Sequence, residues 1–166
     1  MTGVWNWIDS PLGKLLLVSD GHALTRLAMS PRPNDVPADA RRDPAALAPV
    51  AAQLDSYFAG ELTEFDVPLA PRGSAFQLSV WNALLEIPYG ETASYGEIAA
   101  AVDRPDAVRA VGATNGRNPI AVIIPCHRVI GADGSLVGYG GGLDRKRLLL
   151  ELEAEHAAPR LWPARA

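Results

Sequence analysis

The residues whose types and spacing could do chemistry surround the single cysteine of this chain. Cys126 follows an apolar run that ends at Pro125, and His127 and Arg128 come directly after it. A lone thiol beside an imidazole is a candidate nucleophile, and one cysteine cannot form a disulfide within the chain. The alternative is a buried, unreactive cysteine, which is the commoner fate of an isolated thiol in an apolar run.

The thiol would need assistance to react. A free thiol has a pKa near ~8.5, and apolar neighbours such as Ile123 and Ile124 raise it, so a base must lie nearby. In an extended strand, adjacent side chains point to opposite faces. A direct bond between Cys126 and His127 is therefore not expected, and a bridging water or a bend in the chain is required.

Two further motifs flank the cysteine. Asn118-Pro119 lies upstream, and the run Gly138-Tyr139-Gly140-Gly141-Gly142 lies downstream. With the cysteine run, these motifs resemble the signature of the O6-alkylguanine-DNA alkyltransferases, and the resemblance covers residues 74 to 153. It implies direct-reversal DNA repair, in which an alkyl group moves irreversibly from O6-alkylguanine, and also from O4-alkylthymine, in duplex DNA to Cys126. It implies a suicidal methylated-DNA-[protein]-cysteine S-methyltransferase that acts once and uses no cofactor.

The same resemblance assigns roles to further residues. The histidine that matches His127 takes the thiol proton through a water, and the glutamate that matches Glu153 orients it. Tyr95 matches a tyrosine that donates to the base and crowds its 3′ phosphate, and Asn118 matches an asparagine that ties the helix-turn-helix to the cysteine segment. The expected catalytic residues are Cys126, His127, Glu153, Asn118, Tyr95 and Tyr139, and the expected substrate pocket contains Tyr139, Gly140 and Val129.

A helix-turn-helix, predicted from a helix over 95–102 and a second helix from Pro105 to about Asn115, carries the expected DNA contacts. In the family that this chain resembles, the second helix lies in the minor groove, and the arginine that matches Arg109 fills the gap left by a flipped nucleotide. Small residues let such a helix approach the groove closely. The expected DNA-binding residues are Arg109, Ala107, Ala110, Gly112, Tyr95 and Arg128. Without the cysteine signature, the same small residues fit tight helix packing, and Arg109 fits an ordinary surface charge.

Two positions depart from the family pattern. Gly140 stands where some members carry serine, and Ala121 stands where some carry proline. Both changes make the pocket wall smaller or looser. We still expect Cys126 to lie in a tightly packed pocket, between the isoleucine-rich segment and the loop over 138–142.

Composition limits the class of protein. The chain has 166 residues and a net charge of −4, and no stretch approaches the ~18 apolar residues of a membrane span. The charge is uneven, because residues 1–103 hold 6 basic and 13 acidic side chains, whereas residues 104–147 hold 7 basic and 3 acidic ones. The second half therefore suits a duplex DNA partner. We expect a cytoplasmic monomer without metal, membrane or cofactor, and we leave cooperative binding on DNA open.

The N-terminal half predicts a small α/β domain. Short β-prone runs over 4–9, 14–19 and 23–29 predict an antiparallel meander. Residues 30–44 predict a surface loop, and residues 65–69 predict a further strand. Apolar spacing between Pro44 and Phe58 predicts a helix. The resemblance implies that this domain is ribonuclease-H-like.

The second half predicts a mainly helical domain. Apolar spacing predicts helices over 76–85 and 145–155, and a Ser-x-x-Glu capping box predicts a helix over 95–102. Pro105 suits the first turn of a further helix, which completes a helix-turn-helix that the resemblance makes winged-helix-like. We therefore predict an α/β protein with domains at 1–70 and 71–156 and a tail at 157–166.

Two other functions compete with alkyl transfer. A non-catalytic lesion-binding protein of the same fold would flip the base without accepting the alkyl group, but such relatives lack the cysteine. A Cys-His hydrolase normally brings its histidine from elsewhere in the fold, whereas His127 is adjacent to Cys126. Cys126 and its neighbours therefore favour the alkyltransferase.

Overall fold

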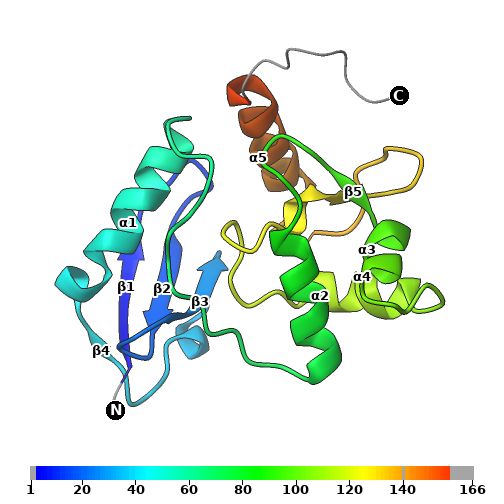
Figure 1. The fold of residues 1–166 in the computed structure, drawn as a ribbon. Coiled ribbons are helices and arrows are strands. Elements are labelled where there is room, and N and C mark those ends of the chain that lie inside the picture. Colours follow the sequence, from blue (N-terminus) through cyan, green and yellow to red (C-terminus); the bar gives the residue numbers. More distant parts are fainter. Residues whose placement is uncertain (1–2, 140, 158–166) are drawn as a thin grey trace.

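A computed structural model describes residues 3–139 and 141–157 and places a small sheet beside a group of short helices (Figure 1). Four strands form the sheet in the order β3-β2-β1-β4: β1 (Val4–Ile8), β2 (Leu15–Ser19), β3 (Leu24–Met29) and β4 (Arg41–Arg42). The antiparallel meander of the first three strands is confirmed. β4 lies within the predicted loop and pairs in parallel with β1, so the sheet is mixed. Two consecutive arginines carry no β pattern, so this strand was not predicted.

Helix α1 (Pro44–Phe58) packs against β1 and begins where the sequence predicts. The Asp43 side chain accepts a hydrogen bond from the N–H of Ala46, and Pro44 occupies the first turn, where a missing N–H leaves no bond unmade. Tyr57, near the end of the helix, is completely buried. Its hydroxyl reaches the C-terminal part of the chain.

The outer edge of β3 joins the two parts of the chain. Leu27 donates its N–H to the carbonyl of Pro119, and its own carbonyl accepts from the N–H of Ala121, a few residues before the cysteine. The free N–H and C=O groups of an edge strand readily take such a partner. This pairing fixes the cysteine segment beside the sheet.

The predicted strand over 65–69 is wrong. It is reduced to a single bridge between Leu24 and Leu69. Pro68 interrupts this run, and a proline has no N–H to donate to a neighbouring strand.

Four helices form most of the C-terminal part: α2 (Ala75–Leu85), α3 (Tyr95–Ala101), α4 (Val108–Gly116) and α5 (Leu143–His156). The first three pack against one another, and α5 packs against the cysteine segment (Figure 1). The helix-turn-helix is the pair α3 and α4. The mainly helical character predicted for this part is confirmed.

The observed start of α3 agrees with the sequence prediction, whereas the observed start of α4 does not. The predicted capping box of α3 is present, because Ser94 and Glu97 each accept a hydrogen bond from the backbone N–H of the other. Helix α4 begins at Val108, later than predicted. Pro105 instead lies in a turn, which is closed by a bond from the N–H of Ala107 to the carbonyl of Arg104.

The cysteine lies in a turn and not in an extended strand. A 3₁₀ turn, η2 (Cys126–Arg128), leads into β6 (Val129–Ile130), which pairs in parallel with β5 (Ala93–Ser94). Shortly before it, Val122 has a φ of 71°, a strained conformation for a β-branched residue. The chain therefore bends sharply before the cysteine. A bend was one of the two alternatives, besides a bridging water, that the sequence left open for Cys126 and His127.

One hydrophobic core runs through both parts of the chain, and it includes Leu27, Tyr57, Trp81 and Ile124. Across the described ranges, every helix is too short or too polar to cross a membrane. Gly140 and residues 158–166 of the predicted tail lie outside the described residues.

Candidate active site

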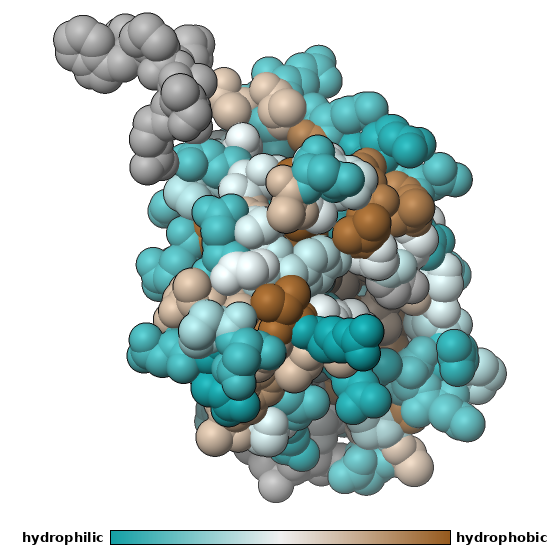
Figure 2. Space-filling model, turned by 90° about the vertical axis from the view of Figure 1, so that its right-hand side faces the viewer, coloured by the Kyte–Doolittle hydropathy of each residue, from teal (hydrophilic) through white to brown (hydrophobic). Residues whose placement is uncertain are grey.

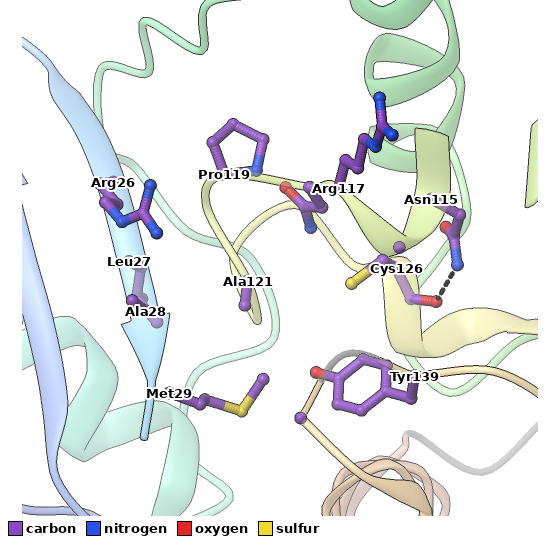
Figure 3. Close-up of a pocket in the computed structure, with 13 residues that line it drawn as sticks. Arg26, Leu27, Ala28, Met29, Asn115, Arg117, Pro119, Ala121, Cys126 and Tyr139 are labelled. Carbon is purple, nitrogen blue, oxygen red and sulfur yellow. Dashed lines mark hydrogen bonds between the residues drawn. The ribbon is translucent and has the colours of Figure 1, made fainter. Parts of the chain in front are cut away.

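Cys126 lies on the wall of a cavity of about 250 Å³ between the two parts of the chain. The residue is only 5% exposed. Figure 3 shows its sulfur pointing into the space between Ala121, Met29 and Tyr139. The expectation of a tightly packed pocket is therefore wrong on the side of the sulfur, which faces free volume.

The far wall of this cavity comes from β3. Residues 26–29, from Arg26 to Met29, line it opposite the cysteine, and Arg117 lines it at the end of α4 (Figure 3). Sequence reasoning missed the β3 wall. Nothing in the alternation of a strand indicates which distant segment it will face.

Two asparagines hold the backbone around the cysteine. Asn118 donates from Nδ2 to the carbonyl of Ile124 at 2.7 Å, and its Oδ1 accepts from the N–H of Ile120 at 3.0 Å. Asn115, in the last turn of α4, donates to the carbonyl of Cys126 at 3.3 Å (Figure 3). Sequence reasoning named Asn118 but missed Asn115. Together they connect the second helix of the helix-turn-helix to the reactive segment.

A buried cluster of ionisable groups lies around Glu153, which is 1% exposed. Its Oε2 accepts from Nε2 of His127 at 2.7 Å and from Nη2 of Arg128 at 3.0 Å, and its Oε1 accepts from Nε of Arg128 at 2.7 Å. The hydroxyl of Tyr57 also donates to Oε2, at 2.5 Å. The structure thus brings His127 and Glu153 together as expected from the resemblance, and it adds a tyrosine from α1 that sequence reasoning missed.

The electrostatics of this cluster fix its protonation state. Burial alone would raise the pKa of Glu153, but the hydrogen bonds and charges of His127 and Arg128 lower it to about 2. Burial lowers the pKa of His127, against the influence of Glu153. Because an ionised carboxylate can only accept, Nε2 of the neutral imidazole carries the hydrogen and Nδ1 is left as an acceptor. Nδ1 is buried and has no hydrogen-bond partner among the described residues.

Arg128 does not face the surface, so the expectation that it contacts DNA is corrected. The residue is only 8% exposed. Besides its two bonds to Glu153, it donates from Nη1 to the carbonyl of Ile87 at 2.7 Å, and its guanidinium lies 5.7 Å from the ring centre of Tyr89. Its charge compensates that of the buried carboxylate.

The groups around the Cys126 thiol shift its pKa in opposite directions. Burial raises the pKa of Cys126, and the Asn118 amide, the Lys146 ammonium and the Tyr139 hydroxyl partly offset this rise. The Tyr139 hydroxyl is buried and has no hydrogen-bond partner among the described residues. Lys146 is fully buried and donates to the carbonyls of Val129 and Val137. Its role was missed, because a lysine in a helix looks like a surface charge.

Val129, expected in the substrate pocket, and Tyr95, expected to donate to the base, do not line the cavity. Val129 is fully buried beneath it, with its carbonyl bonded to Lys146. Tyr95 donates its hydroxyl to the carbonyl of Val137 at 3.0 Å and so braces the loop before Tyr139. Gly140, the remaining expected pocket residue besides Tyr139, lies outside the described residues.

The expected DNA-binding residues of α4 divide between two faces. Arg109 and Ala110 are exposed, whereas Ala107 is buried. Gly112 packs under the ring of Tyr95, since a Cβ there would lie 3.8 Å from the ring. Figure 2 views the side that carries α3 and α4, where the surface is mostly hydrophilic or near neutral and hydrophobic residues form small separate groups.

The described part of the chain contains no cluster of three His, Cys, Asp or Glu side chains that could hold a metal ion.

Comparison with known proteins gives this arrangement a family. Residues 4–71 match the family described as 6-O-methylguanine DNA methyltransferase, ribonuclease-like domain, and residues 75–155 match its DNA binding domain. The chain is 58% identical over 152 residues to the methylated-DNA–protein-cysteine methyltransferase of Mycobacterium bovis, covering 90% of this chain and 92% of the relative.

Solved structures agree with this match. The crystal structure of Mycobacterium tuberculosis O6-methylguanine methyltransferase is similar with a TM-score of 0.87 and 55% identity, covering 96% of this chain and 98% of that one. The structure of Mycobacterium tuberculosis OGT in complex with DNA is similar with a TM-score of 0.87 and 56% identity, over 93% and 94% of the two chains. On the sequence, the fold and the residues around Cys126, this chain belongs to the methylated-DNA–protein-cysteine methyltransferase family.

Proposed function

We propose that this protein repairs duplex DNA by taking the alkyl group of O6-alkylguanine onto Cys126, once per molecule. One observation carries the proposal: a buried thiol faces a cavity, and a histidine with an unpaired Nδ1 and a carboxylate partner follows it in the chain. A relative that is 56% identical has been solved in complex with DNA, which supports DNA as the partner.

The proposed step is a displacement at carbon. The sulfur attacks the alkyl carbon, the C–S bond forms as the O6–C bond breaks, and the electron pair of that bond stays on the base. The thiol proton passes through a bridging water to Nδ1 of His127, whose Nε2 is held by Glu153. The displaced guanine stays in the DNA and takes up a proton from solvent, and the imidazolium of His127 returns its proton to solvent. The thioether on Cys126 has no route back to a thiol, so each molecule acts once.

Donors around the cavity would assist the leaving base. The Tyr139 hydroxyl is buried, unpaired and on the cavity wall, so it can donate to a guanine as negative charge develops on it. For Tyr95 to donate to the base as well, the hydrogen bond from its hydroxyl to the carbonyl of Val137 must break. We propose that binding of the flipped base brings about this exchange.

The base would reach the cavity by flipping out of the duplex, because the O6 substituent cannot meet a buried thiol inside the stack. We propose that α4 enters the minor groove with Arg109 and Ala110, which are exposed, and that Arg109 fills the space of the flipped nucleotide. Arg117 lies on the cavity wall and would meet the backbone near the extruded base.

Several finer features complete the proposal. We propose that O4-alkylthymine is a second substrate, that the protein is a cytoplasmic monomer, and that residues 1–70 and 71–156 are its two domains. The two matched family regions, 4–71 and 75–155, support this division.

Intact-mass analysis tests the function. The protein is mixed with a duplex that contains O6-methylguanine, and the expected product carries one methyl group per chain, located on Cys126 by peptide sequencing. Cys126→Ser serves as the control and should gain no mass, and added chelator should change nothing. Methylation of another residue, or more than one lesion repaired per molecule, would contradict the proposal.

A further inference from the structure

The side chain of Tyr57 connects the N-terminal part of the chain to Glu153 of the proposed proton relay. Its hydroxyl lies 2.5 Å from Oε2 of Glu153, and both residues are buried. Burial and the adjacent Glu153 charge raise the pKa of Tyr57 far above its usual range. The hydroxyl therefore stays protonated at any working pH and acts as a permanent donor.

Tyr57 shares its acceptor with the histidine of the relay. Oε2 of Glu153 also accepts from Nε2 of His127 and from Nη2 of Arg128. A hydrogen bond to a carboxylate stabilises its negative charge and lowers its basicity. Each additional donor on Oε2 therefore weakens the support that this oxygen can give to a protonated His127.

We propose that Tyr57 is a positioning residue of the relay: its hydroxyl holds Oε2 of Glu153 in place and limits how strongly that carboxylate favours the imidazolium of His127. The inference rests on the proposed function, because the relay matters only if Cys126 is the acceptor. It gives the ribonuclease-like part a direct share in the chemistry.

The groups around His127 come from several elements. They are Cys126 and Arg128 of η2, Lys146 and Glu153 of α5, Tyr57 of α1, and Tyr89 of the loop after α2. Among these described groups, Tyr57 is a neutral one that bonds directly to Glu153. Replacing it changes the hydrogen bonding of Glu153 and leaves the charges in place.

The expected effect of Tyr57→Phe is a more basic His127 and a larger fraction of thiolate paired with imidazolium. One hydrogen bond of ordinary strength corresponds to about half a pKa unit to one unit, so this fraction rises about three- to tenfold. The rate of Cys126 alkylation by iodoacetamide measures this thiolate fraction, because Cys126 is the only thiol in the chain. We expect the variant to react faster near neutral pH and at the wild-type rate in alkaline buffer, where the thiol is ionised in both.

The pH dependence separates this role from a structural one. A variant that merely loosens the fold also makes the thiol more accessible, so it should still react faster than the wild type in alkaline buffer, where the thiol is ionised in both. Tyr89→Phe is a matched control, because the Tyr89 hydroxyl is also buried, has no hydrogen-bond partner among the described residues, and lies on a ring 6.2 Å from that of Tyr57. It should leave the rate profile unchanged.

A second variant preserves the shape of the side chain. With 3-fluorotyrosine at position 57, the phenol is more acidic and a stronger donor, so alkylation near neutral pH should become slower than in the wild type. A rate for Tyr57→Phe that stays above that of the wild type in alkaline buffer, or changes of the same sign in both variants, would overturn the inference. Neither rate measurement uses DNA. If the wild type also fails to take a methyl group from the modified duplex, the proposed function fails separately.

Discussion

The two sides of the η2 turn differ in how their polar groups are satisfied. On the cavity side, the hydroxyl of Tyr139 and Oδ1 of Asn115 are buried without a partner among the described residues. On the side of α5, both oxygens of Glu153 and all three nitrogens of Arg128 are hydrogen-bonded. A buried polar group without a partner costs free energy. The cavity side therefore suits a polar ligand, whereas the carboxylate of Glu153 and the guanidinium of Arg128 are already paired.

The largest effect is expected from Cys126→Ser, which removes the chemistry of the cavity side alone. Transfer from O6-methylguanine DNA should be lost, because a hydroxyl is a much weaker nucleophile than a thiolate. Lesion binding should persist, since the cavity and the Glu153 cluster are unchanged. Mass analysis and a binding titration check both points, and loss of binding together with transfer would show that the two sides are not independent.

Glu153→Gln disrupts the hydrogen-bonded cluster on the α5 side of the η2 turn. The change leaves Arg128 buried without its ionic partner, and breaking a buried pair in this way typically costs about 3–5 kcal/mol of stability. His127 also loses the carboxylate that supports its charged form, so alkylation of Cys126 should slow. Denaturant unfolding and the pH–rate profile of alkylation measure the two effects. Wild-type values for both would contradict the role given to this cluster.

The same cluster predicts how stability depends on pH. The pKa of Glu153 is about 2 in the fold and its ordinary value is 4.5, so its stabilisation is complete above the ordinary value and is lost as pH falls toward 2. The full contribution is about 3 kcal/mol. His127, whose pKa burial lowers, also favours the unfolded state in acid. Unfolding of wild type and Glu153→Gln across this range should show a smaller acid loss in the variant.

Arg109→Ala separates access to the cavity from the reaction inside it. Repair in duplex DNA should slow roughly tenfold or more, because flipping a base costs a few kcal/mol that only the duplex imposes. Transfer from a free O6-alkylguanine base should not change. Arg41→Ala, which removes the same charge from an exposed residue of β4, is the control. Equal slowing on both substrates would place Arg109 in the chemistry instead.

The smallest effect is expected from methylation of Cys126. Overpacking a filled core costs about 1–3 kcal/mol, but the sulfur points into a cavity of about 250 Å³, so the methyl group has room. We expect a loss of stability below about 1 kcal/mol, since the added group displaces little protein. Calorimetry of the methylated and unmodified forms measures it. A loss as large as that of Glu153→Gln would mean that the cavity closes around the thiol.

Local signals in the sequence predicted most of the elements. Short β-prone runs placed β1, β2 and β3, and a capping box at Ser94 placed the start of α3 at Tyr95. The predictions failed where contacts between distant segments of the chain determine whether a strand forms. β4 exists because Arg41 and Arg42 meet β1, and the run over 65–69 forms one bridge because Pro68 cannot donate.

The residue types around Cys126 were enough to predict a thiol nucleophile, a neighbouring base and a family, because these predictions depend on side-chain chemistry at fixed spacing. Tertiary structure decided which side each group faces. Arg128 follows the cysteine by two positions and yet is buried against Glu153, while Tyr57, far away in the chain, bonds to that same carboxylate. Burial and hydrogen-bond geometry are properties of the packed chain. The partners that tune His127 could therefore be identified only once α1, η2 and α5 had come together.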